Sequence, residues 1–407
     1  MTDQISRTKK RTARRRFIKG LVGGTAALAL GGTTRLVGAQ SRPPIKIGCL
    51  NVFTKSYAGY GETTLNGMNL YFEQVGWQSG GRKIEIIKED DEMTPQVGLE
   101  KVRKFVESDR VRMIAGPLAS NVAMAMVDYM KRSECFWLVV GAAATALTWN
   151  RMPNMFRTTF SFWQVASPMG IWVYDNVAKE IVLTGSDFVS GHDSLGSFKQ
   201  SFTARGGKII KEFYPPLGTT DFSAYLAEIR SINPPATYNF YGGTDSIRFV
   251  RQYTQYGLKE KIQLIGFNSL LDNDTLPGQG KTAVGGLTSS IYCDTLNNKE
   301  NHDFVAAYRK RYKDYPNAFA EAGYTTALII DEAAKAVGGN VEDKAKFAAA
   351  VAAVKINAPR GPMRFDPITH NPIQAIYIRK VVEGDGRIAN QPIATIPEVR
   401  DPGVKPA

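Results

Sequence analysis

The residues that could carry out catalysis do not combine into a known catalytic pattern. Ser190, His192 and Asp193 supply the three residue types of a hydrolytic triad. Side chains this close in sequence point apart, whereas a triad needs a nucleophile, a base and an orienting acid in contact. The G-x-S-x-G pattern of a nucleophile elbow does not occur in the chain. We therefore predict no catalytic residue, and a protein that is not an enzyme.

Phosphate and metal sites also lack residues that they would need. Residues 278–282, GQGKT, end like a P-loop, but Thr275 stands where that pattern requires glycine. The sequence Asp272-Asn273-Asp274 lacks the glycine and the distal glutamate of a calcium loop. Three histidines, without a cluster of Cys, His and Glu, do not make a zinc site. We expect neither a cofactor nor a bound metal.

The N-terminus has the pattern of an export signal. Arg14-Arg15-Arg16 precedes an apolar run, Leu21–Leu30, and small residues follow at 37–39. The run is half as long as the roughly 20 residues that a membrane-spanning helix needs. The arginines resemble those of the twin-arginine signal of bacteria. We expect residues 1–39 to be removed, which would leave a mature chain that lies in the periplasm and is not embedded in the membrane.

Loss of this signal would change the charge balance of the chain. The whole sequence carries a net charge of +13, but residues 1–39 hold nine of its basic residues and one aspartate. The remaining charge of +5 is not gathered into a basic run, so we predict no binding to nucleic acid. Of the three cysteines, Cys49 lies in an apolar run that is typical of a strand, and we do not expect a structural disulfide.

Strand and helix patterns alternate from Ile45 onward. One series of β-branched runs comprises IKIGCL, KIEIIKED, VRMIAG and FWLVVG, and a second comprises EIVLTG, KIIKEFY, ATYNFYGG and IQLIGF. Segments of helical period separate the runs, which predicts an α/β fold with parallel sheets covered by helices on both faces. Two such series, over the 368 residues that follow the signal, predict two similar lobes.

The loops that follow the strands are rich in small and polar residues. Ligands of open parallel sheets bind beyond the carboxyl ends of the strands, where these loops gather. Ser120 and Thr145 would lie where hydroxyl groups and the amides of helix N-termini converge on a carboxylate. Helix capping explains the same two residues equally well.

Six segments together resemble the leucine/isoleucine/valine-type periplasmic binding proteins, which are extracytoplasmic receptors of ABC importers. They are IKIGCLNVFTKSYAGYGETTLNGMNLYFEQV, GRKIEIIKEDDEMTPQVGLEKVRKFVE, IAGPLASNVAMAM, GAAATALT, YPPLGTTDFSAYLAEI and RGPMRFDPITHNPIQAIYIRKV. The resemblance implies two α/β lobes joined by three hinge crossovers. It assigns residues 44–160 and 294–362 to one lobe, residues 161–293 and 363–392 to the other, and residues 393–407 to a C-terminal tail.

The resemblance also implies a ligand site in the cleft between the lobes. Ser120, the backbone of Ala143 and Thr145 would hold a carboxylate on the first lobe. Tyr60 and Phe319 match aromatic positions that line the pocket.

On the closing lobe, the resemblance points to two loops. Ser190 stands where relatives commonly have an aromatic residue. Residues 241–245, YGGTD, align with the loop that helps to hold the far end of the ligand, so Tyr241 and Thr244 are candidates for that contact.

The chain departs from the resemblance after the strand IQLIGF. Receptors for amino acids usually place a carboxylate there to bind the α-ammonium group, and this chain has Asn268. A buried ammonium group without an anionic partner is costly. Either Asp245 or Glu321 would have to replace the missing charge, or the ligand is an aromatic or aliphatic carboxylic acid, an amide or urea.

We therefore expect a receptor that binds a small carboxylate-bearing ligand, either a branched-chain or hydrophobic amino acid or an aromatic or aliphatic acid. Its partners would be that ligand and the membrane permease subunits of an ABC importer. The alternative is a periplasmic sensor of amides, urea or acids that acts on a signalling protein.

Overall fold

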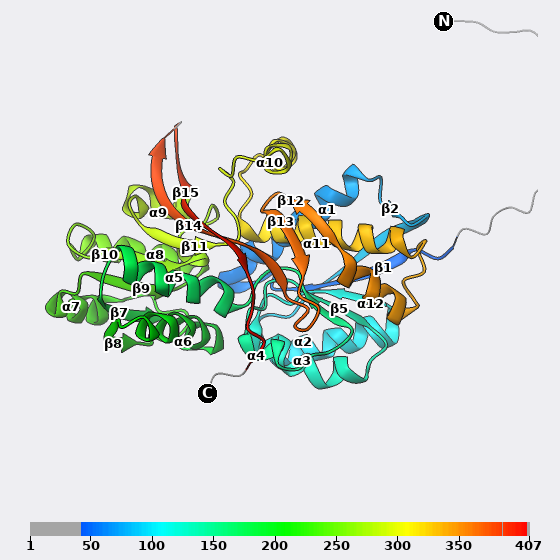
Figure 1. Ribbon diagram of the computed structural model, residues 1–407, viewed down its shortest axis with the longest axis horizontal. Coiled ribbons are helices and arrows are strands. Elements are labelled where there is room, and N and C mark those ends of the chain that lie inside the picture. The colour runs from blue at the N-terminus through cyan, green and yellow to red at the C-terminus, as the bar shows by residue number, and fades with distance from the viewer. Residues whose placement is uncertain (1–41, 385, 405–407) are drawn as a thin grey trace, which may run out of the picture. The chain divides into compact units, whose positions relative to one another are not determined.

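Alternating strands and helices form two sheets in the computed structural model, which describes residues 42–384 and 386–404 (Figure 1). The predicted export signal lies outside the described residues. We name each lobe by its sheet. The first lobe holds the sheet of β1–β6 with helices α1–α4 and α10–α12, and the second lobe holds β7–β11, β14 and β15 with helices α5–α9.

The first sheet has the strand order β2-β3-β1-β4-β5-β6, and all of its pairs are parallel except β2 with β3. Its strands are β1 (Ile45–Asn51), β2 (Gln78–Ser79), β3 (Arg82–Asp90), β4 (Met113–Ala115), β5 (Phe136–Val139) and β6 (Met155–Arg157). Its helices are α1 (Ala58–Gln74), α2 (Pro95–Arg103), α3 (Ser120–Arg132), α4 (Thr145–Thr148), α10 (Lys299–Tyr312), α11 (Ala318–Ala336) and α12 (Lys344–Ala353).

Helices cover both faces of this sheet, as the alternation of residues along its strands requires. In β4, Met113 and Ala115 pack into the core under α1, α11 and α12, whereas Ile114 packs into the core under α2 and α3. Helices α1 and α11 cross closely because both have glycine at the contact. A Cβ atom on Gly67 would lie 1.9 Å from the carbonyl oxygen of Ala320, and one on Gly323 would lie 1.9 Å from that of Thr64. This crossing brings the first turn of α11 beside the start of α1.

The second sheet is mixed. Strands β8, β7, β9, β10 and β11 pair in parallel, and β14 and β15 extend the sheet with antiparallel pairs. These strands are β7 (Glu180–Gly185), β8 (Lys208–Phe213), β9 (Ala236–Phe240), β10 (Gln263–Phe267), β11 (Leu287–Ser290), β14 (Pro372–Gly384) and β15 (Arg387–Val399). The helices are α5 (Phe162–Asn176), α6 (Val189–Ala204), α7 (Ser223–Ile232), α8 (Gly243–Gln255) and α9 (Leu276–Gln279).

The chain passes between the lobes three times, at residues 158–161, 291–298 and 366–371. The prediction of a two-lobed α/β fold is thus confirmed, with an antiparallel end to the second sheet that the helical spacing did not indicate. β15 continues to Val399, so residues 393–399 form a strand and the predicted tail begins too early.

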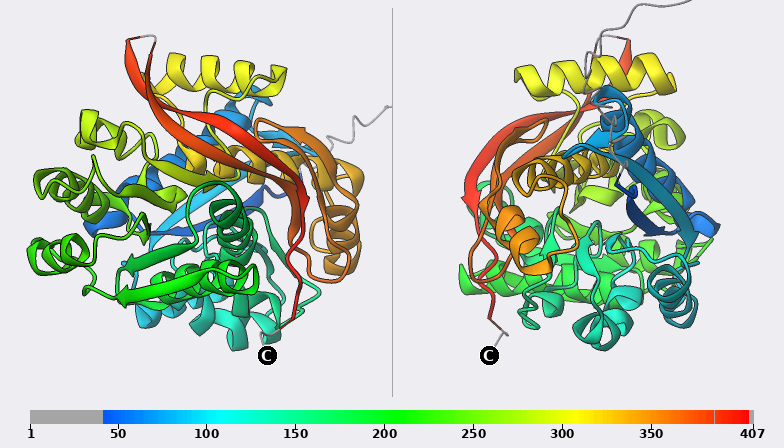
Figure 2. Two further views of the ribbon diagram at one scale, coloured as in Figure 1. Left: turned by 60° about the vertical axis from the view of Figure 1, so that its left-hand side comes forward. Right: turned by 90° about the vertical axis from the view of Figure 1, so that its right-hand side faces the viewer.

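A hairpin links the two lobes beside the third passage. β12 (Lys355–Ala358) pairs with β13 (Gly361–Phe365), which pairs in turn with the first residues of β14. Figure 2 shows this orange hairpin beside the long red β14–β15 pair. Met363 and Phe365 pack into the core of the first lobe, although both lie in the range that we assigned to the second.

Candidate functional site

A cavity of about 50 Å³ lies between the two lobes, where the carboxyl ends of the parallel strands of both sheets meet. The first lobe and the first passage supply Tyr57, Tyr60, Met93, Leu118, Ala119, Gly141, Ala143, Phe160 and Phe319. The second lobe supplies Phe162, Phe188, Ser190, Phe240, Phe267 and Ser269. Most of these residues lie at the carboxyl end of a strand or in the loop after it, which is the ordinary place for a ligand in such sheets.

Eight of the fifteen lining residues are aromatic, and no charged side chain lines the wall. The ring centroids of Tyr60 and Phe319 are 4.5 Å apart. On the other wall, the ring of Phe267 lies 5.3 Å from the rings of both Phe162 and Phe240. All three pairs are tilted, with interplanar angles of 36°, 55° and 48°, and aromatic rings present flat, weakly polar faces to a ligand. The cavity therefore suits an apolar, flat ligand.

The loop after β5 supplies a backbone donor to this cavity. Four amides of the loop are engaged within the described part of the chain: Gly141 donates to Thr159, Ala142 to Pro117, Ala144 to Ser120 and Thr145 to Asp193. The amide of Ala143, a wall residue, donates to no acceptor among the described residues. Gly141 allows the turn because its φ is +103°, and a Cβ atom there would lie 2.7 Å from Leu118.

The structure brings together four of the predicted ligand-binding residues. Tyr60, Ala143, Ser190 and Phe319 all line the cavity. Tyr60 also reaches across the cleft, because its hydroxyl accepts a hydrogen bond of 2.9 Å from the amide of Gly243 in the second lobe. Ser190 lies in the first turn of α6, whose unpaired amides favour an anion nearby.

Ser120 and Thr145 lie close to the cavity but are not on its wall. The Ser120 hydroxyl accepts the amide of Ala144 at 3.1 Å and so fixes the loop. The amide and hydroxyl of Thr145 donate to the carboxylate of Asp193, at 2.7 and 2.9 Å. Thr145 thus holds a carboxylate, but it is one from the second lobe of the same chain. Burial raises the pKa of Asp193 more than these hydrogen bonds lower it.

The remaining three predicted residues lie away from the wall. The Tyr241 ring packs against Phe222 and Phe249 inside the second lobe. Thr244 lines a separate hollow, beside Gly243 and Asp274. Asn268 is fully buried between the wall residues Phe267 and Ser269, and neither polar atom of its side chain has a hydrogen-bond partner among the described residues.

Neither acid that could replace the missing ammonium partner faces the cavity. Glu321 is fully buried in an ion pair of 2.6 Å with Arg360, which is equally buried. Asp245 accepts the amide of Gly218 and pairs with Arg248 at the start of α8. The structure therefore offers no carboxylate to an ammonium group in the cavity.

Sequence reasoning missed one charged residue behind the wall. Arg157, at the end of β6, is 2% exposed and forms no ion pair within the described part of the chain. Its guanidinium donates to the carbonyl groups of Ala142, Ala144 and Phe160, and its Nε donates to Asn371. Burial lowers its pKa to about 10. The sequence marks this residue only as a single charged side chain in the otherwise uncharged segment NMFRTTF.

The residues considered for catalysis are engaged elsewhere. His192 pairs with Asp187 on the surface, Asp193 binds Thr145, and Ser190 faces the cavity, so the three do not form a triad. Asp272 pairs with the buried Arg379. No group of three or more His, Cys, Asp and Glu side chains suited to a metal occurs in the described residues, where the three cysteines are buried and free.

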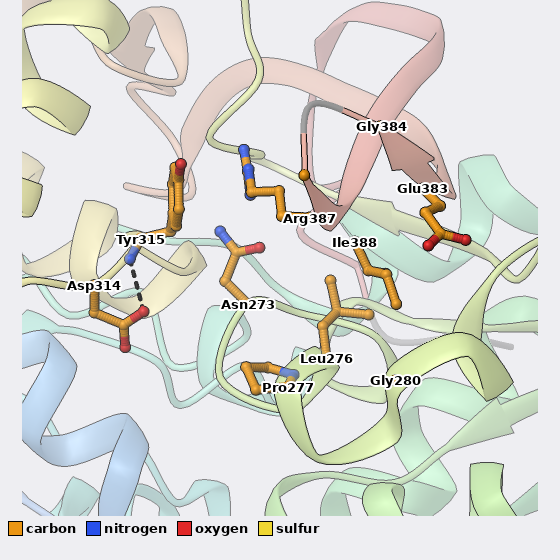
Figure 3. A pocket seen from close by; sticks show the side chains of 11 residues that line it. Asn273, Leu276, Pro277, Gly280, Asp314, Tyr315, Glu383, Gly384, Arg387 and Ile388 are labelled. Atoms are coloured by element: carbon orange, nitrogen blue, oxygen red, sulfur yellow. Dashed lines mark hydrogen bonds between the residues drawn. The ribbon is translucent and has the colours of Figure 1, made fainter.

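A larger hollow of about 560 Å³ lies at the far end of the β14–β15 hairpin (Figure 3). Two of its charged residues form ion pairs: Arg387 with Asp294, while it also stacks on Tyr315, and Glu383 with Lys281. The third, Asp314, accepts a hydrogen bond from the amide of Tyr315. It lies at the turn between β14 and β15, whereas the aromatic cavity lies where the carboxyl ends of the parallel strands of both lobes meet, so the aromatic cavity is the better candidate.

A family model described as periplasmic binding protein matches residues 44–387. The chain belongs to the periplasmic binding protein family. Members are substrate-binding proteins of ABC-type transport and not enzymes. Leu/Ile/Val-binding protein homolog 6 of Brucella melitensis is 29% identical over 367 residues, which cover 89% of this chain and 94% of that protein. No helix of the described residues is long and apolar enough to cross a membrane.

Two solved structures of the family show the same fold at higher identity. A solute-binding protein of R. palustris, in complex with benzoate, is 32% identical with a TM-score of 0.81, covering 86% of this chain and 96% of its own. Another from Rhodopseudomonas palustris BisB5, in complex with 3,4-dihydroxybenzoic acid, is 32% identical with a TM-score of 0.84, covering 88% of this chain and 99% of its own.

Proposed function

We propose that this periplasmic binding protein is the receptor of an ABC importer for a monocyclic aromatic carboxylate. The observation that carries the proposal is the interlobe cavity, in which eight of the fifteen wall residues are aromatic and none is a carboxylate that could bind an ammonium group. The solved relatives with benzoate and 3,4-dihydroxybenzoic acid support the same ligand class.

The polarity of the cavity favours a single aromatic ring over a branched-chain amino acid, because the wall offers aromatic faces and has no carboxylate for an ammonium group. The ring would lie between Tyr60 and Phe319 on one side and Phe240 and Phe267 on the other. Its carboxylate would receive hydrogen bonds from the Ala143 amide and from Ser190 with the first amides of α6.

Binding would couple to closure of the two lobes. The three passages between the lobes would act as the hinge, and a ligand that contacts both lobes stabilises the closed state over the open one. Permease subunits would then recognise the closed form. With the twin-arginine-type signal predicted for residues 1–39, we place this exchange in the periplasm.

A thermal-shift and calorimetry panel tests the ligand class. The chain without residues 1–39 is titrated with benzoate, 4-hydroxybenzoate, 3,4-dihydroxybenzoate, leucine, isoleucine and urea. We expect the benzoates to bind and to raise the melting temperature, because a ligand at a hundredfold excess over Kd stabilises the native state by about 2.7 kcal/mol. Binding of leucine or isoleucine with no response to any benzoate would contradict the proposal.

A further inference from the structure

The buried cation Arg157 lies directly behind the loop that carries the ligand-facing amide. Its Nη1 donates to the carbonyl oxygen of Ala142 at 2.9 Å, and its Nη2 donates to that of Ala144 at 3.0 Å. In a trans peptide the C=O and N–H bonds point in opposite directions. The two peptide groups therefore turn their carbonyls toward the guanidinium and their amides away from it.

The N–H groups of these two peptides have different surroundings. The amide of the second group belongs to Thr145, and it binds the Asp193 carboxylate at 2.7 Å. The amide of the first group belongs to Ala143, which lines the cavity and has no acceptor among the described residues. One of two similarly placed amides thus already binds an anion, and the other faces the ligand cavity.

The charge of Arg157 is not neutralised by direct contact with an acid. Its hydrogen-bond acceptors are carbonyl groups, the side chain of Asn371 and the hydroxyl of Thr148. Asp193 and Asp401 are the acids that act on it through space. In a buried environment such a cation polarises the peptides that it binds and attracts a nearby negative charge more strongly than it would in water.

We propose that Arg157 determines the specificity for anionic ligands, by acting on the ligand carboxylate through the peptide group between Ala142 and Ala143. Arg157 touches no ligand and is a positioning residue. This inference rests on the proposed function for the identity of the ligand. The charge of Arg157 also acts on the carboxylate of Asp193, and that effect can be measured without any ligand.

The first experiment compares benzoate with its neutral isostere benzamide, by calorimetry on wild type, Arg157→Lys and Arg157→Gln. We expect wild type to prefer benzoate, and Arg157→Gln to lose about tenfold or more of that preference while it retains its affinity for benzamide. Arg157→Lys keeps the charge and should retain most of the preference. An unchanged preference in Arg157→Gln would overturn the inference, and a wild type that binds neither compound would instead contradict the proposed function.

The second experiment needs no ligand. The carboxyl group of Asp193 is titrated by 13C NMR in wild type, Arg157→Lys and Arg157→Gln. Arg157 lowers the pKa of Asp193, so that pKa should rise in Arg157→Gln and stay near the wild-type value in Arg157→Lys. His192 and Lys199, which line the hollow beside Asp193, are present in all three proteins, so their charges cannot account for a difference in the pKa of Asp193 among the three. Equal values in the three proteins would overturn the inference.

A third experiment covers the case in which Arg157→Gln fails to fold. Asp193→Asn removes the acid on the neighbouring amide and leaves every hydrogen bond of Arg157 in place. Because that acid opposes the field of Arg157 at the loop, we expect Asp193→Asn to increase the preference for benzoate over benzamide. A decreased or unchanged preference would count against the inference.

Discussion

The contact between Thr145 and Asp193 should stabilise the closed arrangement of the two lobes by a measurable amount. Thr145 begins α4 in the first lobe and Asp193 lies on α6 in the second, so their two hydrogen bonds join the lobes directly. The Tyr60 hydroxyl and the Gly243 amide form a second link between the lobes. Removal of the Asp193 carboxylate should therefore destabilise the closed form relative to the open one.

The size of the effect follows from the hydrogen bonds and their exposure. A hydrogen bond to a charged group contributes roughly 1.5–3 kcal/mol when it is well buried. Asp193 is half-buried, and its raised pKa shows that desolvation offsets part of the gain. We therefore expect Asp193→Ala to shift the equilibrium by about 1–2 kcal/mol, which is a factor of about 5–30 in the ratio of closed to open molecules.

Double electron–electron resonance measures that ratio. Spin labels on Arg132→Cys in α3 and Ala204→Cys in α6 would be exposed, one on each lobe, whereas the three native cysteines are buried. Asp187→Ala is the matched control. Asp187 is an exposed acid just before the same helix, and its side chain pairs with His192 of its own lobe and not with the described residues of the first lobe. Ligand-free Asp193→Ala should show more of the long distance than either wild type or the control. Identical distance distributions in all three proteins would refute this account of closure.

Three other substitutions test the cavity and its surroundings. Phe319→Ala removes a ring that packs against Tyr60, and because this ring supplies both apolar area and shape to the cavity, the substitution should weaken benzoate binding by about 2 kcal/mol or more. Calorimetry measures the affinity. An affinity within a factor of two of wild type would contradict the assigned wall. Asn268→Asp places a negative charge between two wall residues and should weaken benzoate binding at pH 7.5 without creating affinity for leucine, whereas a gain of leucine binding would show that this position selects the ligand class. Burial raises the pKa of Asp91 to about 6, so ionisation of this carboxyl group destabilises the folded chain. The destabilisation is absent below about pH 4, where the group is protonated in both the folded and the unfolded chain, and it grows up to about pH 6. Asp91→Asn should therefore raise the free energy of unfolding by about 3 kcal/mol at pH 7.5 and leave it unchanged at pH 4 in chemical denaturation, and an equal effect at both values would rule out the charge as the cause.

Local patterns were sufficient to predict the sheets because burial imposes a period of two on strands and 3.6 on helices. In β4, for example, consecutive apolar residues pack on opposite faces, so a short apolar run between helical segments could only be a strand buried on both sides. The antiparallel β15 was missed because RIANQPIATIPEV is half-exposed and contains two prolines, so its apolar residues do not form a continuous run.

The cavity was only partly predictable, for a reason that lies in its chemistry. Tyr60, Ala143, Ser190 and Phe319 lie in loops or first turns, where the sequence marks them by position. Four further wall residues are phenylalanines of strand ends and helix starts, which have the same pattern as ordinary core: Phe162, Phe188, Phe240 and Phe267. An apolar ligand site is made of core residues that have no core neighbour on one side, and only the packing of two lobes reveals that.

The arrangement around Arg157 also explains how a receptor can select an anion and still release it. A direct ion pair in a closed, dry cleft would be strongly held, since breaking it leaves two buried charges unpaired. In this chain the cation donates to carbonyl groups of the first lobe and of the first passage, and a ligand in the cavity would not have to replace these bonds. Opening the cleft would therefore expose only the ligand carboxylate and neutral donors to water, while Arg157 stays solvated by the protein. In the proposed function, the cost of release would then fall on separating the aromatic walls, which is the step that a permease would drive by pulling the lobes apart.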